Sequence, residues 1–257
     1  KILSARPSQK DYQNIKHHLY GFRHVKKNFS TGDWLKQTNK KIIDLRKRKK
    51  TAILVGGTGL YFKVLTNGLV SIPNIPVRLR TKIRFLHKKL GSKNFFLELV
   101  KLDPLVKNQI KSSDTQRCIR AYEVKLSTNK SIYNWYKNTK SNYEKKDFYK
   151  IYVDFPRNEL LNRINLRAQE MIKMGAVPEV KRFIKLKVPK DKTANKAIGI
   201  SEVKEYLNKK NDIGEVIEKI SIKTRQYAKR QSTWARGNMQ NWNKMNPTQL
   251  KNFLKKI

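Results

Sequence analysis

The sequence predicts an α/β protein with a parallel sheet core and a helical insertion. The apolar residues 52–55 are followed by a glycine turn and a helical segment, which is the order of a buried strand, a ligand-binding turn and a helix. Farther along, the chain reads as helices only, until an alternating strand pattern starts at residue 151. A sheet-forming chain interrupted by a helical stretch accounts for both observations.

The first part of the core alternates between helix and strand. Residues 29–50 are predicted to form a helix with one apolar face. Ser30 and Asp33 have the spacing of a capping box at its start. This helix leads into the predicted strand at residues 52–55. A second helix over residues 59–66 follows the glycine turn and ends before an Asn-Gly pair.

The insertion begins at the first of two prolines, Pro73 and Pro76, and contains no convincing strand. We expect it to occupy residues 73–149 and to close with a polar tract. Its apolar periodicity predicts helices at residues 79–90, 95–100, 104–110 and 115–126.

The chain then returns to the core, which we expect to comprise residues 1–72 and 150–257. Residues 151–156 alternate as a strand, and residues 158–174 form an amphipathic helix that Gly175 ends. The last long helix covers residues 213–236.

The glycine turn is a candidate phosphate site. Glycines let the backbone approach an anion closely, and the free N–H groups of the following helix point toward it. Thr58 adds a hydroxyl donor. The turn lacks the Lys-Ser/Thr of a Walker loop, so a tight strand-to-helix corner without a ligand remains the alternative. Its glycines are Gly56, Gly57 and Gly59.

The net charge indicates a polyanionic partner. The chain has 59 Lys and Arg against 19 Asp and Glu, a formal charge of +40. Nucleic acid is the leading partner, and its binding would weaken steeply with salt. A general compositional bias toward lysine accounts for part of the excess, whereas the 38% hydrophobic content excludes a purely disordered basic chain.

The last long helix places cations on one face. Arg225, Lys229, Ser232 and Arg236 recur at spacings of four, three and four. A solvated basic helix with Trp234 in the core is the alternative to a surface that grips a nucleic-acid backbone.

Two arginine pairs at helical spacing could bind phosphate oxygens, although such pairs are common in so basic a chain. They are Arg117 with Arg120 and Arg163 with Arg167.

Several classes of site and location are disfavoured. Cys118 is a lone cysteine, and no apolar stretch reaches the roughly 18 residues of a membrane span. We expect a cytoplasmic protein that does not contact a membrane and is a monomer. The His17-His18 pair has no partner at ligand spacing, so no metal site is expected, and no serine or cysteine triad is apparent.

A series of short motifs runs in order along nearly the whole chain. They are Ser4-Ala5-Arg6-Pro7, Lys16-His17-His18-Leu19 and the segments 54–61, 103–104, 116–124, 163–175, 197–199 and 224–236. Together they resemble the tRNA dimethylallyltransferases, also called tRNA isopentenyltransferases.

The resemblance implies a transferase that moves a dimethylallyl group from dimethylallyl diphosphate to N6 of the adenosine 3′-adjacent to the tRNA anticodon. It implies a P-loop-NTPase-like fold, a fold of the ATP-binding class, with a helical insertion that contacts the anticodon arm. Mg²⁺ would accompany the diphosphate, and the adenine would be flipped out of its stack.

The same resemblance assigns roles to particular residues. Thr58 would lie near the reacting centre, and Arg167 would hold the diphosphate. The residues implied to contact tRNA are Arg80, Gln116, Arg117, Cys118, Ile119, Arg120, Lys196, Ala197, Ile198, Gly199, Ile200, Ser201, Lys229, Arg230, Gln231, Ser232, Thr233, Trp234, Ala235 and Arg236.

The chain departs from the family pattern in three places. The family's Walker-type loop and Asp-Ser motif precede the first matching motif and are absent here, so we expect these 257 residues alone to be inactive. Gly21 replaces an aspartate, and Ile200 replaces a tyrosine. A non-catalytic RNA-binding protein is the alternative, and a small-molecule phosphotransferase is a third hypothesis.

Overall fold

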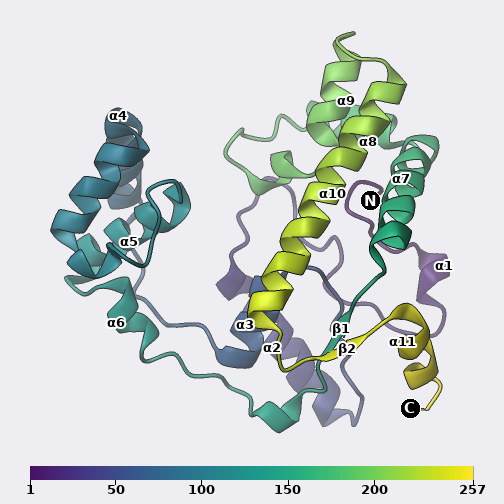
Figure 1. Cartoon of the computed structure of the whole chain (residues 1–257), viewed down its shortest axis with the longest axis horizontal. Coiled ribbons are helices and arrows are strands. Elements are labelled where there is room, and N and C mark those ends of the chain that lie inside the picture. Colours follow the sequence, from purple (N-terminus) through teal and green to yellow (C-terminus); the bar gives the residue numbers. More distant parts are fainter. Residues whose placement is uncertain (257) are drawn as a thin grey trace. The chain divides into compact units, whose positions relative to one another are not determined.

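The computed structural model describes residues 1–256 and divides into two compact units (Figure 1). Unit 1 combines Lys1–Phe62 with the chain from Phe148 onward, and unit 2 is Lys63–Asp147. Unit 2 therefore starts ten residues earlier than the predicted insertion. The reason is local packing, because the Ser141 hydroxyl donates to the carbonyl of Leu65 over 3.2 Å.

Unit 1 is mainly helical. It contains, in chain order, α1 (Gln9–Tyr12), α2 (Thr31–Lys47), the start of α3 (Gly59–Asn67), β1 (Ile151–Val153), α7 (Arg157–Lys173), α8 (Ala176–Lys185), the 3₁₀ turn η3 (Thr193–Lys196), α9 (Ile200–Leu207), α10 (Ile213–Asn238), β2 (Asn243–Met245) and α11 (Pro247–Leu254).

The sheet of unit 1 is small and parallel. Strand β1 pairs with β2 in parallel, with Tyr152 opposite Lys244. The expectation of an α/β fold with parallel pairing is thus confirmed at this level.

The predicted strand at residues 52–55 is wrong. This segment has no strand structure, and Ile53 and Val55 are 73% and 80% exposed. An apolar run becomes a strand only when a neighbouring strand supplies hydrogen-bond partners, and no strand among residues 1–256 pairs with it.

Local signals at helix ends are confirmed. The Asp33 N–H donates to the Ser30 hydroxyl over 3.1 Å, and the Ser30 N–H donates to the Asp33 carboxylate over 2.9 Å, which completes the predicted capping box. Gly175 has a φ of 98°, a left-handed conformation that favours glycine and separates α7 from α8.

The core of unit 1 lies among the helices that follow β1. Its buried side chains come from the end of α7, from α8, α9 and the first half of α10: Ala168, Met171, Ala176, Val180, Ile200, Val203, Val216 and Ile220. These contacts fix the orientation of α10 relative to α7.

Unit 2 is an all-helical body among its described residues. It contains the rest of α3, then α4 (Val77–Leu102), the 3₁₀ turns η1 (Pro104–Val106) and η2 (Lys145–Asp147), α5 (Thr115–Thr128) and α6 (Ile132–Tyr136). The helix predicted at residues 104–110 is reduced to η1.

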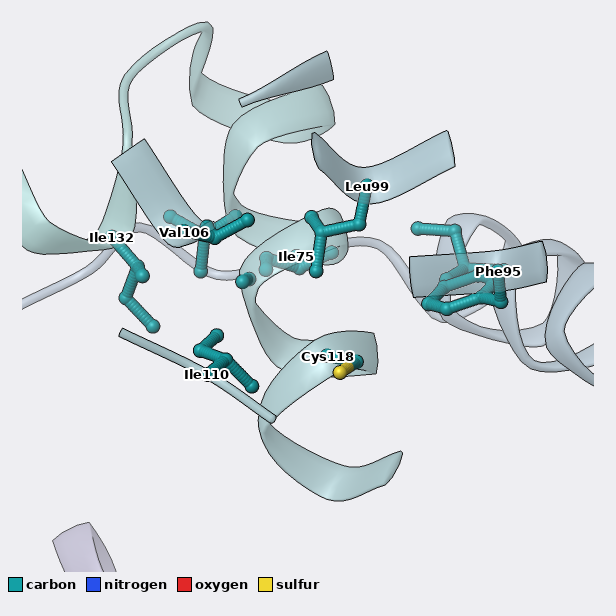
Figure 2. Close-up of a cluster of buried hydrophobic side chains, with 10 residues drawn as sticks. Ile75, Phe95, Leu99, Val106, Ile110, Cys118 and Ile132 are labelled. Carbon is teal, nitrogen blue, oxygen red and sulfur yellow. The ribbon is translucent and has the colours of Figure 1, made fainter. Parts of the chain in front are cut away.

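Helix α4 bends sharply at Gly91, which has φ 72° and ψ 168°. The rings of His87 and Phe95 lie 5.0 Å apart, whereas eight residues of straight helix would span about 12 Å. The two helices predicted at residues 79–90 and 95–100 are therefore separate segments. Figure 2 shows the core that they enclose with α5 and α6, including Phe95, Leu99 and Cys118.

Candidate functional site

A cavity of about 970 Å³ lies in unit 1 between the first half of α7, the second half of α10 and the two strands. Its apolar wall includes Phe155, Leu160, Ile164 and Trp242. A concave surface of this size with a mixed lining is the usual form of a small-ligand or nucleotide site.

The polar lining of the cavity is strongly cationic. Arg157, Arg225, Lys229, Arg236 and Lys244 line it. Its one lining carboxylate belongs to Asp154, which binds the Lys244 ammonium over 2.8 Å and raises the pKa of that lysine. Arg157, Arg225 and Lys229 make no ion pair with residues 1–256. The cavity therefore attracts anions.

Helix α10 supplies one wall of this cavity. Arg225, Lys229, Ser232 and Arg236 all line it, so the face inferred from their spacing exists in the structure. Ala235 also lines the cavity but is 5% exposed, and it offers only a methyl surface.

The opposite side of α10 packs on the glycine turn. The Gln231 amide donates to the carbonyl of Gly57 over 3.0 Å, and the ring of Trp234 lies against Gly59. The turn continues into α3, where Phe62 meets Trp242 of the cavity wall with ring centroids 5.5 Å apart. The turn and the cavity are thus two sides of one assembly around α10.

This packing explains why two of the turn residues are glycines. Gly56, Gly57 and Gly59 do not have the left-handed φ that glycine alone tolerates well. A Cβ on Gly59 would lie 2.2 Å from the Trp234 ring, and one on Gly57 would lie 2.1 Å from the Gln231 amide. Close approach of α10 therefore requires small residues here whether or not a phosphate binds.

We expect Gly59→Ala to destabilise unit 1 by about 1–3 kcal/mol, because a packed indole must move to admit the new methyl group. Gly57→Ala is the matched control, since the end of a flexible glutamine can rotate away at the loss of one hydrogen bond, about 1 kcal/mol or less. Urea unfolding of both variants tests the difference, and equal midpoints would contradict the packing argument.

Thr58 and Arg167 are exposed, and neither lines the cavity. On the same helix as Arg167, Arg163 lies over the Phe155 ring at 4.7 Å and 3.9 Å from the Glu159 carboxylate. Of the predicted pair on α7, Arg167 is thus the guanidinium without an ion pair among residues 1–256.

The segment implied by resemblance at residues 196–201 is mostly core. Ile200 is 4% exposed, and Gly199 has a φ of 102° against the side chain of Leu3. The side chains of Ala197 and Ile198 pack on the same core. The side chain of Ile200 is therefore taken up by core packing, whereas Lys196 is exposed and its predicted contact with tRNA stays a prediction.

A buried carboxylate organises this segment. Glu202, 1% exposed, accepts hydrogen bonds from the Gly199 N–H and the Ser201 hydroxyl, both over 2.8 Å, and binds the Lys223 ammonium. Burial raises the pKa of Glu202, but these donors outweigh it and leave the pKa lowered. Sequence reasoning missed this residue, whose one signal is its position three residues after Gly199, as in a capping box.

In unit 2 the residues predicted to contact tRNA differ in how far their side chains are exposed. Gln116 and Arg117 are exposed at the start of α5, and Ile119 and Arg120 are half-buried. Cys118 is 1% exposed and its side chain lies in the core of unit 2, so only its backbone could take part in the predicted contact (Figure 2).

Arg80 is half-buried in α4. Its Nε is buried and has no hydrogen-bond partner among residues 1–256.

Two features are absent from residues 1–256, a cluster of metal ligands and a helix suited to span a membrane. No group of three or more His, Cys, Asp or Glu side chains within residues 1–256 has the geometry to hold a metal ion. In the same part of the chain, no helix is both long and apolar enough to span a bilayer.

Comparison with known proteins identifies the family. Residues 1–238 match the family described as IPP transferase. The chain is 52% identical over 257 residues to the tRNA dimethylallyltransferase of Pelagibacter ubique (strain HTCC1062), covering all of this chain and 82% of that protein. It is 37% identical over 249 residues to the tRNA dimethylallyltransferase of Agrobacterium fabrum, covering 96% and 84%.

A solved structure agrees with these relatives. The full-length tRNA isopentenylpyrophosphate transferase from Bacillus halodurans superposes with a TM-score of 0.64 at 26% identity, over 95% of this chain and 76% of that one. The matches cover both units and the α10 wall of the cavity. The chain therefore belongs to the IPP transferase family.

Proposed function

We propose that the protein transfers a dimethylallyl group from dimethylallyl diphosphate to N6 of the adenosine 3′-adjacent to the anticodon of tRNA. Family membership and relatives named for this reaction support the proposal. The structural observation that carries it is the cavity, whose apolar wall faces a row of cations on α10.

The cavity suits a nucleoside with its flanking phosphates. Phe155 and Trp242 offer aromatic surface to a base, while Arg225, Lys229 and Arg236 offer charge-assisted hydrogen bonds to the backbone. Because a base held between its neighbours in a stack cannot enter a cavity of this kind, the adenine must leave the stack to reach such a site.

Departure of diphosphate leaves negative charge that fixed cations and N–H dipoles must stabilise. Arg167 has an exposed guanidinium without an ion pair among the described residues, and the start of α3 offers N–H groups beside Thr58. These groups lie on different sides of α10 and are two separate candidates for binding the diphosphate, whereas we assign the tRNA to the α10 face.

Mg²⁺ enters this proposal only as a counterion of the donor diphosphate. Residues 1–256 form no cluster of metal ligands, and the cavity carboxylate of Asp154 is already bound to Lys244. Magnesium commonly binds through substrate phosphates with few protein ligands, and no step is derived from it.

The test uses the protein expressed from its complete reading frame, with tRNA, dimethylallyl diphosphate and Mg²⁺. Nucleoside mass spectrometry is expected to show one N6-dimethylallyl adenosine next to the anticodon. We expect Arg167→Ala to lower kcat/KM for the diphosphate about 100-fold with tRNA affinity unchanged, since a charge-assisted contact contributes about 1.5–3 kcal/mol.

Lys173→Ala is the matched control, because it removes an exposed cation from the same helix. Absence of modified adenosine with the wild-type protein would refute the proposed reaction. Normal diphosphate kinetics in Arg167→Ala would remove that residue from the donor site.

A further inference from the structure

Helix α6 of unit 2 carries two tyrosines that the reaction does not use. The rings of Tyr133 and Tyr136 meet edge to face, with centroids 5.8 Å apart and an interplanar angle of 86°. Tyr133 packs on the unit 2 core, whereas the side chain of Tyr136 is 49% exposed. One ring therefore supports the other and leaves it open to solvent.

The helix that presents these rings is firmly attached. Ile132 is 4% exposed in the core, and the Trp135 indole donates to the Thr128 hydroxyl at the end of α5 over 3.2 Å. Lys130 lies 5.0 Å from the Trp135 ring centroid. A short helix anchored on both sides holds Tyr136 in place before any ligand binds, which lowers the entropic cost of binding.

Two guanidinium groups of α5, the helix that precedes α6, act electrostatically on Tyr136. Arg120 and Arg117 of α5 both lower the pKa of Tyr136, although burial outweighs them and leaves it raised, so the phenol stays neutral near pH 7. Arg117 has the more exposed side chain, at 75%, and contacts Asp114 at 2.8 Å. Arg120 contacts Glu123 at 3.5 Å.

A supported, half-exposed aromatic ring on a helix that follows an arginine-bearing helix has the chemistry of a single-stranded RNA site. Unpaired bases stack on tyrosine rings, and guanidinium groups hold the adjoining phosphates. Paired bases in a helix have no free face to offer such a ring. The +40 charge of the chain selects an RNA ligand over an apolar peptide.

We propose that Tyr136, supported by Tyr133, is a stacking platform for an unpaired base of the RNA whose phosphates contact Arg117 and Arg120. The inference rests on tRNA being the substrate of this protein. It assigns to unit 2 the recognition of a looped-out or loop nucleotide in addition to backbone contacts.

The experiment measures binding of two RNA probes to the protein expressed from its complete reading frame. One probe is an anticodon stem-loop. The other is a blunt-ended duplex with the same stem sequence and no loop. Tyr136→Leu is expected to bind the stem-loop about tenfold to a hundredfold more weakly than wild type, whereas Tyr136→Phe binds it like wild type. Both variants bind the duplex like wild type.

Salt dependence separates stacking from charge. Tyr136→Leu should keep the slope of log K against log salt, because it removes no phosphate contact. Arg117→Gln should reduce that slope by about 0.7 to 0.9. Tyr149→Leu, which changes a 64% exposed tyrosine of unit 1, is the matched control with wild-type binding.

The proposal would be overturned if Tyr136→Leu bound the stem-loop with wild-type affinity. It would also be overturned if Tyr136→Leu and Tyr136→Phe lost equal affinity for the stem-loop, or if Tyr136→Leu lost as much affinity for the duplex as for the stem-loop. Circular dichroism melting of Tyr136→Leu checks that unit 2 remains folded. The readout is binding, so it is independent of whether prenyl transfer is observed.

Discussion

Replacing Glu202 by alanine is expected to lower the free energy of unfolding by about 1–3 kcal/mol, mainly because a buried N–H loses its acceptor. The substitution leaves the Lys223 ammonium without its carboxylate and the Gly199 N–H without its buried acceptor. It also opens space beside the core formed by α8, α9 and α10. Urea unfolding measures the loss.

The same residue makes stability depend on pH. The folded-state pKa of Glu202 is lowered, so its charge stabilises the native state above the unfolded-state pKa of about 4.3. That contribution is lost as the pH falls through the lowered folded-state pKa. Glu202→Gln is expected to be less stable than wild type at pH 7. The difference in the free energy of unfolding between the two proteins should shrink as the pH falls through this range, because only wild type has a carboxylate to protonate.

Glu205→Gln is the matched control on the same helix, since Glu205 bonds Asn211 and Lys219 at the surface. It is expected to change stability far less than Glu202→Ala. Equal stability of wild type and Glu202→Ala at pH 7 would contradict the role given to the buried carboxylate.

Neutralising the cavity face of α10 is expected to have the largest effect on tRNA binding. The triple variant Arg225→Gln, Lys229→Gln and Arg236→Gln removes three cations from the cavity wall. If each contacts a phosphate, the slope of log K against log salt falls by about 2 to 3. At low salt we expect about threefold to 150-fold weaker binding, since each exposed charge pair contributes about 0.2–1 kcal/mol.

The control has the same change in net charge elsewhere in unit 1. Lys173→Gln, Lys181→Gln and Lys185→Gln alter exposed lysines of α7 and α8 that do not line the cavity. This variant should keep affinity within about threefold and lose less of the slope. Equal losses in the two variants would show that overall charge, and not the α10 face, governs binding.

Local features of the fold were predictable from sequence because they depend on near neighbours. The Ser30 capping box, the left-handed Gly175 and the shared face of Arg225 and Arg236 each follow from spacing along a helix. The bend at Gly91 separates helices that periodicity had already distinguished.

Features that depend on distant segments were not predictable. Residues 52–55 have the composition of a strand, but strand formation requires a partner that composition does not reveal. Strand β2 is three residues long and mostly exposed, so it has no recognisable alternation. The cavity joins residues 152–164 to residues 225–244, and no pattern within either segment predicts that meeting.

The burial of predicted contact residues was likewise hidden. Cys118 lies between Arg117 and Ile119 in a motif identified by resemblance, yet helix geometry turns its side chain inward. A motif identifies a segment, whereas the three-dimensional packing decides which of its side chains reach a ligand.

The dual packing of α10 has a mechanical consequence. Gln231 and Ser232 are adjacent in the chain but point to different sides, one to the carbonyl of Gly57 and the other into the cavity. Because the glycine turn lies on the other side of α10, a displacement of the helix that widened the cavity would press the Gln231 amide and the Trp234 indole against Gly57 and Gly59. Binding of a large ligand in the cavity is thereby coupled to the conformation of the glycine turn on the other side of α10.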